Sequence, residues 1–167
     1  ARALLDQAGF IDRNGDGVRE SASGVALRFG LVYPTGSGTY SQAMLIVQAG
    51  LADVGVEMEL QPTDFRIMLG LLDTDSFQAI SLAWTSSIEI NPRQMFHSSQ
   101  IGVGENFMHY RNDTLDRLID LARQETDREA RMTLWRAVHQ VLYEDQPYTF
   151  MFRRHSLVAV NDRIGGV

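Results

Sequence analysis

The sequence contains no cysteine. This absence excludes disulfide bonds, thiolate nucleophiles and zinc sites that use sulfur ligands. It does not fix the compartment, because a protein without cysteine is compatible with either side of a bacterial inner membrane.

Long hydrophobic runs and an excess of positive charge are also missing. No apolar stretch approaches the ~20 residues that a membrane-spanning helix requires. Lysine and arginine together number 15, whereas aspartate and glutamate number 21, so the formal net charge is −6 at neutral pH. A chain with this charge repels phosphate backbones and anionic lipids, which makes nucleic acids and membrane surfaces poor candidate partners.

The motifs of common enzyme classes are absent as well. The sequence has no nucleophile elbow, no zinc-binding His-Glu-x-x-His pair, no Walker loop and no kinase motif. The four histidines are scattered, and no two of them have the i, i+4 spacing of metal ligands. They are His97, His109, His139 and His155. We therefore do not expect an enzyme.

What is present is the composition of a folded domain. Hydrophobic residues make up 44% and charged residues 22% of the 167 residues, close to the averages of globular proteins. This length predicts a single domain, residues 1–167. The first nine residues are typical of a helix already under way, without an initial methionine or a signal peptide, so we expect a fragment of a longer protein.

The spacing of apolar residues predicts alternating strands and helices. Alternation over residues 25–33 predicts a strand, and helical spacing over residues 39–54 predicts a helix. Residues 56–60 predict a second strand, which Pro62 is expected to end. Strand, crossover helix and strand form a βαβ unit, in which the two strands are parallel.

Further elements are predicted towards the C-terminus. Thr63 is expected to cap a short helix, and residues 77–84 are expected to form a buried strand. Asn112 and Asp127 are the expected caps of two helices. Two terminal strands are predicted over residues 148–152 and 157–160. Together these elements predict an α/β fold, a mixed sheet with a βαβ unit flanked by helices.

One segment follows the spacing of a calcium-binding loop. Residues 12–20 place oxygen ligands at alternate loop positions, with Gly17 at the sharp turn. The candidate ligands are Asp12, Asn14, Asp16, the backbone carbonyl of Val18, and Glu20. Ser23 stands where calcium loops have a bidentate glutamate, which lowers the expected affinity. The alternative is a loop of Asx turns, in which these side chains bond the backbone.

Several motifs, in their order and spacing, resemble a known family. They are Ala3–Phe10 with the following Asn14–Gly17, Gln48–Glu59, Ala83-Trp84, Asn91-Pro92, Phe96–Gln100, Asn106–Ile119 and Leu142–Tyr148. The chain resembles the C-terminal lobe of the large extracytoplasmic solute-binding proteins of family 5. These are the dipeptide- and oligopeptide-binding proteins that feed peptide, nickel and opine ABC importers.

The resemblance implies one lobe of a type II periplasmic-binding-protein-like clamp, in which two lobes close on a ligand. The implied partners are a peptide or another small solute, the missing N-terminal lobe and the ABC permease subunits. A periplasmic or extracytoplasmic location follows, with a membrane-anchored lipoprotein as one form of it. We expect a monomer that requires no cofactor. The alternative function is a calcium-binding interaction module that uses the Asp12–Glu20 loop.

The resemblance also implies a ligand site after the third predicted strand. The implied ligand-binding residues are Trp84, Thr85, Ser86, Ser87, Glu89 and Asn106. In the family an aspartate three residues after this tryptophan often pairs with the α-amine of the ligand, and that position is Ser87 here. Either Glu89 replaces this charge, or the ligand is not a free-amine peptide. Trp84 as a core aromatic and Asn106 as a loop-bonding residue are the alternatives.

Overall fold

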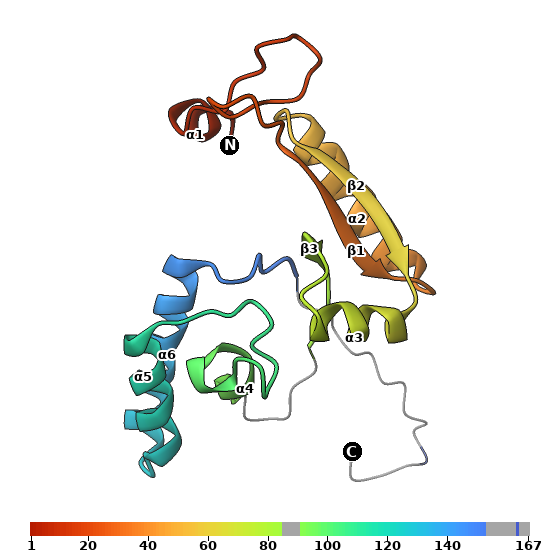
Figure 1. Cartoon of the computed structure of the whole chain (residues 1–167). Coiled ribbons are helices and arrows are strands. Elements are labelled where there is room, and N and C mark those ends of the chain that lie inside the picture. The colour runs from red at the N-terminus through yellow and green to blue at the C-terminus, as the bar shows by residue number, and fades with distance from the viewer. Residues whose placement is uncertain (85–90, 153–162, 164–167) are drawn as a thin grey trace. The chain divides into compact units, whose positions relative to one another are not determined.

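The computed structural model describes residues 1–84, 91–152 and 163. The chain divides into two compact units, Ala1–Ile90 and Asn91–Val167 (Figure 1). Each unit has its own hydrophobic core. Among the described residues, no helix combines the length and the hydrophobicity needed to cross a membrane.

The first unit contains a three-stranded parallel sheet in the order β2-β1-β3. Strand β1 (Arg28–Pro34) is central and contains a buried apolar run, which is typical of a parallel strand that has neighbours on both sides. Strand β2 (Glu57–Thr63) continues through Pro62, so the expectation that this proline ends the strand is wrong. The described sheet has β2 at its edge, where a missing backbone N–H is tolerated.

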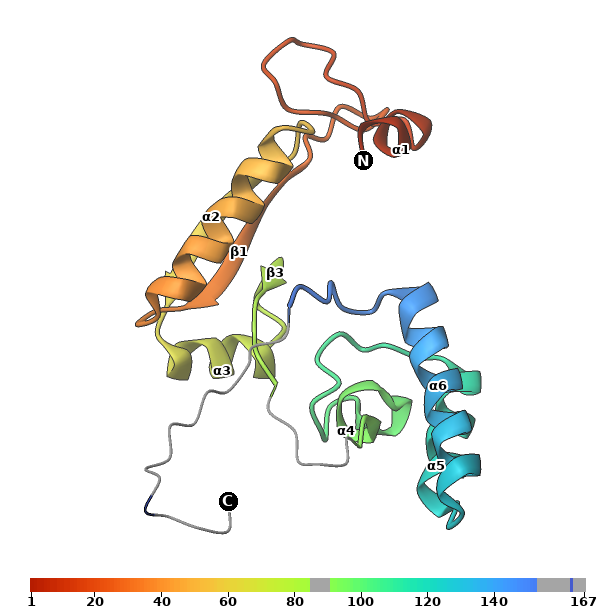
Figure 2. The ribbon, with the colours of Figure 1, turned by 180° about the vertical axis from the view of Figure 1, so that it is seen from behind.

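Helix α2 (Gly38–Ala52) connects β1 to β2, which confirms the predicted βαβ unit (Figure 2). Its inner side packs against the odd-numbered side chains of β1 and against β2. The buried members of this core are Leu31, Tyr33, Met44 and Met58. The Gln48 side chain donates a hydrogen bond of 2.8 Å to the backbone carbonyl of Met58 and so ties the helix to the sheet.

Other side chains of β1 and β2 meet in polar contacts. The guanidinium of Arg28 lies 2.6 Å from the Glu57 carboxylate. The Gln61 side chain lies across Gly30, where an added Cβ would come within 2.5 Å of it. The Gly30 N–H donates to Gln78 at 2.7 Å. Glycine at position 30 therefore leaves room for the side chain of Gln61.

The elements after β2 differ from the prediction in detail. Helix α3 (Phe65–Asp73) begins after Asp64, whose side chain accepts from the Arg66 N–H at 2.8 Å, so the cap is Asp64 and not Thr63. Strand β3 covers only Ala79–Ile80. The N–H of Ser81 still donates to the Val32 carbonyl at 2.8 Å, but the strand ends well before the predicted residue 84.

The side chain of Arg19 joins the N-terminal segment to the chain between α2 and β2. Helix α1 (Arg2–Gln7) lies within the first nine residues, where a helix is predicted, and its Leu4 is 70% exposed. The Arg19 guanidinium donates to the carbonyls of Phe10 at 2.6 Å and Val54 at 2.8 Å. Gly55 has φ +82° and lies directly against this side chain, which leaves no room for a Cβ.

The second unit is helical. It contains α4 (Arg93–Phe96), the short 3₁₀ helix η1 (Ser98–Gln100), α5 (Asp113–Gln124) and α6 (Arg128–Asp145). Asn112 and Asp127 cap α5 and α6, as predicted. The two helices bury an apolar seam together with α4. Its buried residues are Phe96, Leu115, Ile119, Val138 and Leu142.

The predicted terminal strand over residues 148–152 is wrong, because this described segment has no strand. Its aromatic rings pack instead against Phe96: the ring centroids of Tyr148 and Phe150 lie 5.0 and 6.4 Å away. Burial, with the nearby Glu105 carboxylate, raises the pKa of Tyr148 to about 12. The predicted strand over residues 157–160 lies outside the described residues, and the described sheet is parallel rather than mixed.

Candidate functional site

The carboxyl ends of the three parallel strands lie together at one end of the sheet in the first unit, which we call the carboxyl edge to distinguish it from the outermost strand β2. The chain leaves β1 towards β2 on one side, and β3 lies on the other side of β1. In open α/β sheets a ligand crevice forms where the strand order reverses in this way, because the loops that follow neighbouring strands run to opposite sides and leave a gap between them. This edge is therefore the candidate functional site.

Hydroxyl groups line the edge beside β1. Ser37 caps α2, and its hydroxyl accepts from the Tyr40 N–H at 3.4 Å. The Ser81 hydroxyl donates to the Tyr40 hydroxyl at 3.4 Å, which links the start of α2 to the chain leaving β3. The sequence analysis did not assign Tyr40 or Ser81 to the site. Their place within the residues that follow β1 and β3 is the signal that could have found them.

Of the predicted ligand-binding residues in this unit, the structure describes Trp84. It lies four residues after the end of β3 and is 42% exposed, so it is not a core aromatic. Thr85, Ser86, Ser87 and Glu89 lie outside the described residues. Their role in ligand binding stays a prediction.

Asn106 lies in the second unit and is only 2% exposed. Its amide donates to the carbonyls of His97 at 3.2 Å and Tyr110 at 2.9 Å. Its side-chain oxygen accepts from the Tyr110 N–H at 3.0 Å. These bonds engage both ends of the amide and favour the loop-bonding alternative over ligand contact.

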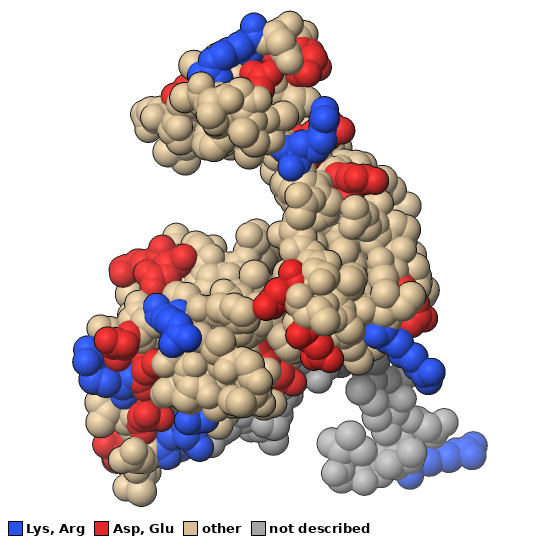
Figure 3. All heavy atoms as spheres, viewed as in Figure 1, with Lys and Arg blue, Asp and Glu red and all other residues tan. Residues whose placement is uncertain are grey.

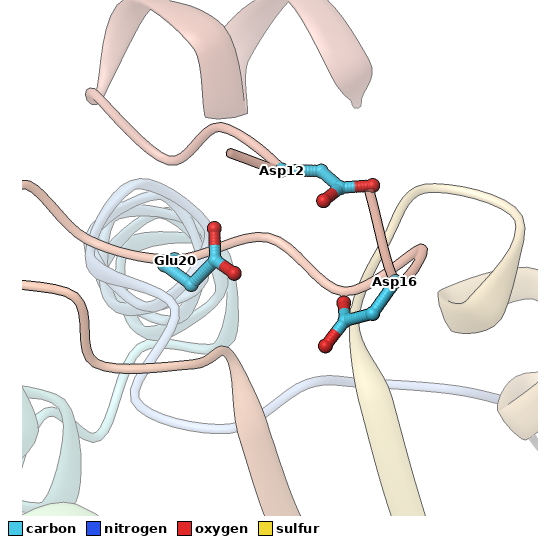
Figure 4. Close-up of side chains that lie close together, drawn as sticks. All are labelled: Asp12, Asp16 and Glu20. Atoms are coloured by element: carbon cyan, nitrogen blue, oxygen red, sulfur yellow. The ribbon is translucent and has the colours of Figure 1, made fainter. Parts of the chain in front are cut away.

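The predicted calcium loop brings three carboxylates together. Asp12, Asp16 and Glu20 each offer an oxygen, and these oxygens all lie within 4.8 Å of one another (Figure 4). Asp12 and Asp16 are exposed, whereas Glu20 is buried. The close grouping agrees with the spacing seen in the sequence.

Backbone donors already engage these carboxylates. The Asp12 carboxylate accepts from the N–H groups of Gly15 at 2.7 Å and Gly17 at 3.0 Å. The hydrogen bond from the Val18 N–H, followed by that from Asn14, holds the pKa of Asp16 below its usual range. This is the pattern of the Asx-turn alternative, in which the side-chain oxygens bond the backbone of the loop. Calcium binding stays a prediction from the sequence.

A buried histidine in the second unit lies near two carboxylates. The Nδ1 of His97 accepts from the Ser99 N–H at 3.1 Å, and its Nε2 lies 3.4 Å from the Asp120 carboxylate. The Ser98 hydroxyl donates to Asp116 and not to the imidazole. Because the serine is not bonded to the histidine, the cluster lacks the geometry of a nucleophile with its base.

The fold and the edge site define the class of protein. The chain has an α/β fold with a small parallel sheet, and its structural neighbours are solute-binding proteins of the periplasmic-binding-protein-like fold. The α/β class predicted from the sequence is confirmed. None of the protein-family models matches the sequence.

Particular relatives narrow this class. The chain is 29% identical over 168 residues to the oligopeptide-binding protein AppA of Bacillus subtilis (strain 168). The alignment covers 99% of this chain and 31% of that protein. The structure of AppA in complex with a nonapeptide matches with a TM-score of 0.81 over 88% of this chain and 29% of that chain.

A second solved structure matches at lower similarity. NikZ of Campylobacter jejuni, in complex with Ni(L-His), is 25% identical with a TM-score of 0.75, over 87% of this chain and 30% of that chain. The matches confirm the resemblance to the solute-binding family indicated by the sequence motifs. The chain spans about a third of the length of the curated relative.

Proposed function

We propose that the chain is the C-terminal lobe of the substrate-binding component of an ABC importer, which captures a peptide or a similar small solute between two lobes. The observation that carries this proposal is the match to AppA, a protein whose structure holds a nonapeptide, over nearly the whole of this chain. An affinity for solute then depends on a second lobe, because one open edge leaves most of a ligand in water.

The edge of the sheet supports a defined contribution to such a cleft. Trp84 offers exposed apolar area that accepts different side chains of a ligand. The hydroxyls of Tyr40 and Ser81 offer donors and acceptors on the rigid end of the sheet. Side chains of this kind contact peptide backbone without requiring a particular sequence.

Glu89 is the proposed charge partner of the ligand. Ser87 takes the position of the family's amine-binding aspartate, and a serine hydroxyl carries no charge. Glu89 is two residues further along the chain. We propose that it pairs with a cationic or free-amine group of the solute.

The proposal includes the partners and the location. The N-terminal lobe would close over the edge, the ABC permease subunits would receive the loaded protein, and the protein would work outside the cytoplasm. The relatives are binding proteins, so no catalytic step is part of the proposal.

Ligand titration of the complete two-lobed protein tests the site. Trp84→Ala should weaken binding of an oligopeptide by at least about tenfold, because a large contact area is lost. Val25→Ala is the matched control: Val25 is 65% exposed in the same unit but precedes β1, at the other end of the sheet. Equal affinities of the Trp84 variant and the control would contradict the assignment of the edge as the site.

Glu89→Gln tests the charge partner separately. A cationic or free-amine ligand should lose roughly 1.5–3 kcal/mol of binding free energy, the contribution of a charge-assisted hydrogen bond. A neutral ligand should bind the variant and the parent protein equally. An unchanged affinity for the cationic ligand would mean that Glu89 is a solvated loop charge.

A further inference from the structure

The loop between α1 and β1 contains an asparagine followed by a glycine, Asn14-Gly15, and both residues are exposed. The side-chain oxygen of Asn14 accepts from the Asp16 N–H at 2.9 Å, which forms an Asx turn around Gly15. The N–H of Gly15 donates to the Asp12 carboxylate at 2.7 Å. Figure 4 shows the Asp12 side chain reaching the stretch of chain just before Asp16. One turn therefore holds an amide carbonyl, a backbone N–H and a carboxylate together.

These groups have the roles needed for an intramolecular ring closure. The nitrogen of Gly15 is the nucleophile, and the missing Cβ of glycine leaves the approach to it open. The Asp12 carboxylate is placed to take the proton of this nitrogen. The Asp16 N–H donates to the oxygen that becomes negative when the side-chain carbonyl carbon of Asn14 is attacked. Holding these groups in one turn lowers the entropic cost of the reaction.

We propose that Asn14 is a modification site, at which the side chain deamidates through a cyclic imide. A bond forms between the Gly15 nitrogen and the side-chain carbonyl carbon of Asn14, and the bond from that carbon to Nδ2 breaks. The Nδ2 group leaves as ammonia with the proton that Gly15 gave to Asp12. Water then adds to the imide and opens it at either carbonyl, which leaves aspartate or isoaspartate at position 14.

The next two residues repeat the arrangement with a carboxylate in place of the amide. The Asp16 carboxylate accepts from the Val18 N–H at 2.8 Å, and the Gly17 N–H donates to Asp12 at 3.0 Å. The hydrogen bond from Val18 holds the pKa of Asp16 below its usual range, so this carboxyl is ionised at neutral pH. A nucleophile attacks an ionised carboxylate poorly, because the carbonyl carbon already carries the electrons of two oxygens. The reaction is therefore expected at Asn14 and not at Asp16.

Deamidation changes the charge of the loop. The Asn14 amide donates to the Asp16 carboxylate at 3.1 Å, and a carboxylate at position 14 repels it instead. One negative charge is added to a chain whose net charge is −6. In the isoaspartate product the main chain also runs through the former side chain, so the Asx turn is lost.

A time course of the 167-residue chain in mildly alkaline buffer, followed by peptide mapping with mass spectrometry, tests the proposal. Asn14 should deamidate at least about tenfold faster than Asn112, whose side chain caps α5. Asp12→Asn keeps an oxygen that accepts from the Gly15 N–H but does not take its proton. This variant should slow the deamidation of Asn14 at least about tenfold.

Glu20→Gln is the matched control for the loss of a carboxylate. Glu20 accepts from the Arg13 N–H and belongs to the same loop, so its replacement should leave the rate at Asn14 unchanged. Asp16→Asn creates a second asparagine-glycine pair in the repeated turn, and position 16 should then deamidate as well. Circular dichroism checks that all three variants fold.

Urea separates the effect of the turn from that of the sequence. In urea the parent chain and Asp12→Asn should deamidate at equal rates, because the turn is gone. Equal rates of the two folded chains would overturn the proposal, and so would an Asn14 that stays intact in the folded chain while it deamidates in urea. A folded Asp16→Asn variant that stays unmodified at position 16 would overturn it equally.

Discussion

The two units of this chain differ in what their outer surfaces carry. In the second unit, acidic and basic side chains are interspersed over α5 and α6 (Figure 3). The buried apolar residues lie in the seam between the helices, whereas Leu121 on the outer side of α5 is exposed. In the first unit, α2 has no charged residue, and the hydroxyls of Tyr40 and Ser81 lie at the carboxyl edge of the sheet. Charged side chains therefore cover much of α5 and α6, whereas the surface of α2 offers only uncharged ones.

The units also differ in how their contacts arise. The second unit packs α5 against α6, which follow one another along the chain. The first unit pairs β1 with β2, so that Arg28 contacts a residue 29 positions away. Local contacts form with little loop-closure cost, whereas the sheet requires its crossover helix to be in place.

The largest effect is expected from a cavity in the second core. Ile119 is fully buried, and Ile119→Ala should cost about 2–5 kcal/mol of unfolding free energy. Leu121→Ala, on the exposed side of the same helix, should cost less than about 0.5 kcal/mol. Hydrogen exchange should locate the added opening in α4, α5 and α6. Equal acceleration in β1 and β2 would contradict two separate cores.

A smaller effect is expected at the arginine anchor of the first unit. Gly55→Ala places a Cβ at φ +82° and 2.7 Å from the Arg19 side chain, so it should cost more than the ~1–2 kcal/mol of a left-handed backbone. Gly9→Ala has a similar φ of +83° with no neighbour within 4 Å, and should cost only the backbone part. Urea unfolding measures both variants. Equal losses of unfolding free energy in the two variants would show that the Arg19 side chain moves aside without cost.

Helix caps provide a direct comparison of the units. Asn112 accepts from two N–H groups, at 2.9 and 3.0 Å, so Asn112→Ala should cost about 1 kcal/mol. Ser37 accepts from one N–H at 3.4 Å, and Ser37→Ala should cost less. Thermal unfolding of the two variants measures the difference. A larger loss for Ser37→Ala would reverse the ranking that the distances predict.

The smallest effect concerns acid stability. Hydrogen bonds from the Tyr110 hydroxyl and then from Asn112 hold the pKa of Asp145 below its usual range. Because the folded pKa is the lower one, this stabilisation is complete above the unfolded pKa and is lost as pH falls through the folded pKa. Asp145→Asn should therefore reduce the loss of stability between about pH 5 and pH 2. An unchanged pH profile would contradict a role for this carboxylate.

Tyr110 provides the alkaline counterpart. Burial, and then the hydrogen bond to Asp145, raises the pKa of Tyr110. The unfolded chain releases this proton first, so stability should fall as pH rises above about 10. Tyr110→Phe should reduce this dependence, and the raised pKa of Tyr148 should account for part of what remains. Unfolding at alkaline pH measures the difference between the variant and the parent protein.

Sequence patterns predicted the local features of this fold well. The caps at Asn112 and Asp127 and the buried positions of α5 follow from side-chain type and helical spacing. The short β3 was not predictable, because an apolar run does not reveal how many of its residues find a partner strand. Likewise, Pro62 could not be recognised as an edge residue before the strand order was known.

The candidate site was predictable in part. The sequence predicts Trp84 at the end of a strand, but β3 ends four residues earlier, and the side chain of Trp84 is exposed. The hydrogen bond between Tyr40 and Ser81 joins residues 41 positions apart, and no local sequence pattern predicts it. Asn106 was assigned to ligand binding because the family resemblance reports a position and not the hydrogen bonds that engage it.

Calorimetric titration with an oligopeptide tests the central claim, that this chain is one lobe of a solute clamp. The complete two-lobed protein should bind with a dissociation constant in the micromolar range or tighter, whereas the 167-residue chain alone should bind at least about a hundredfold more weakly. Micromolar binding by the chain alone would contradict the claim, and so would the absence of binding to the complete protein across peptides and related small solutes.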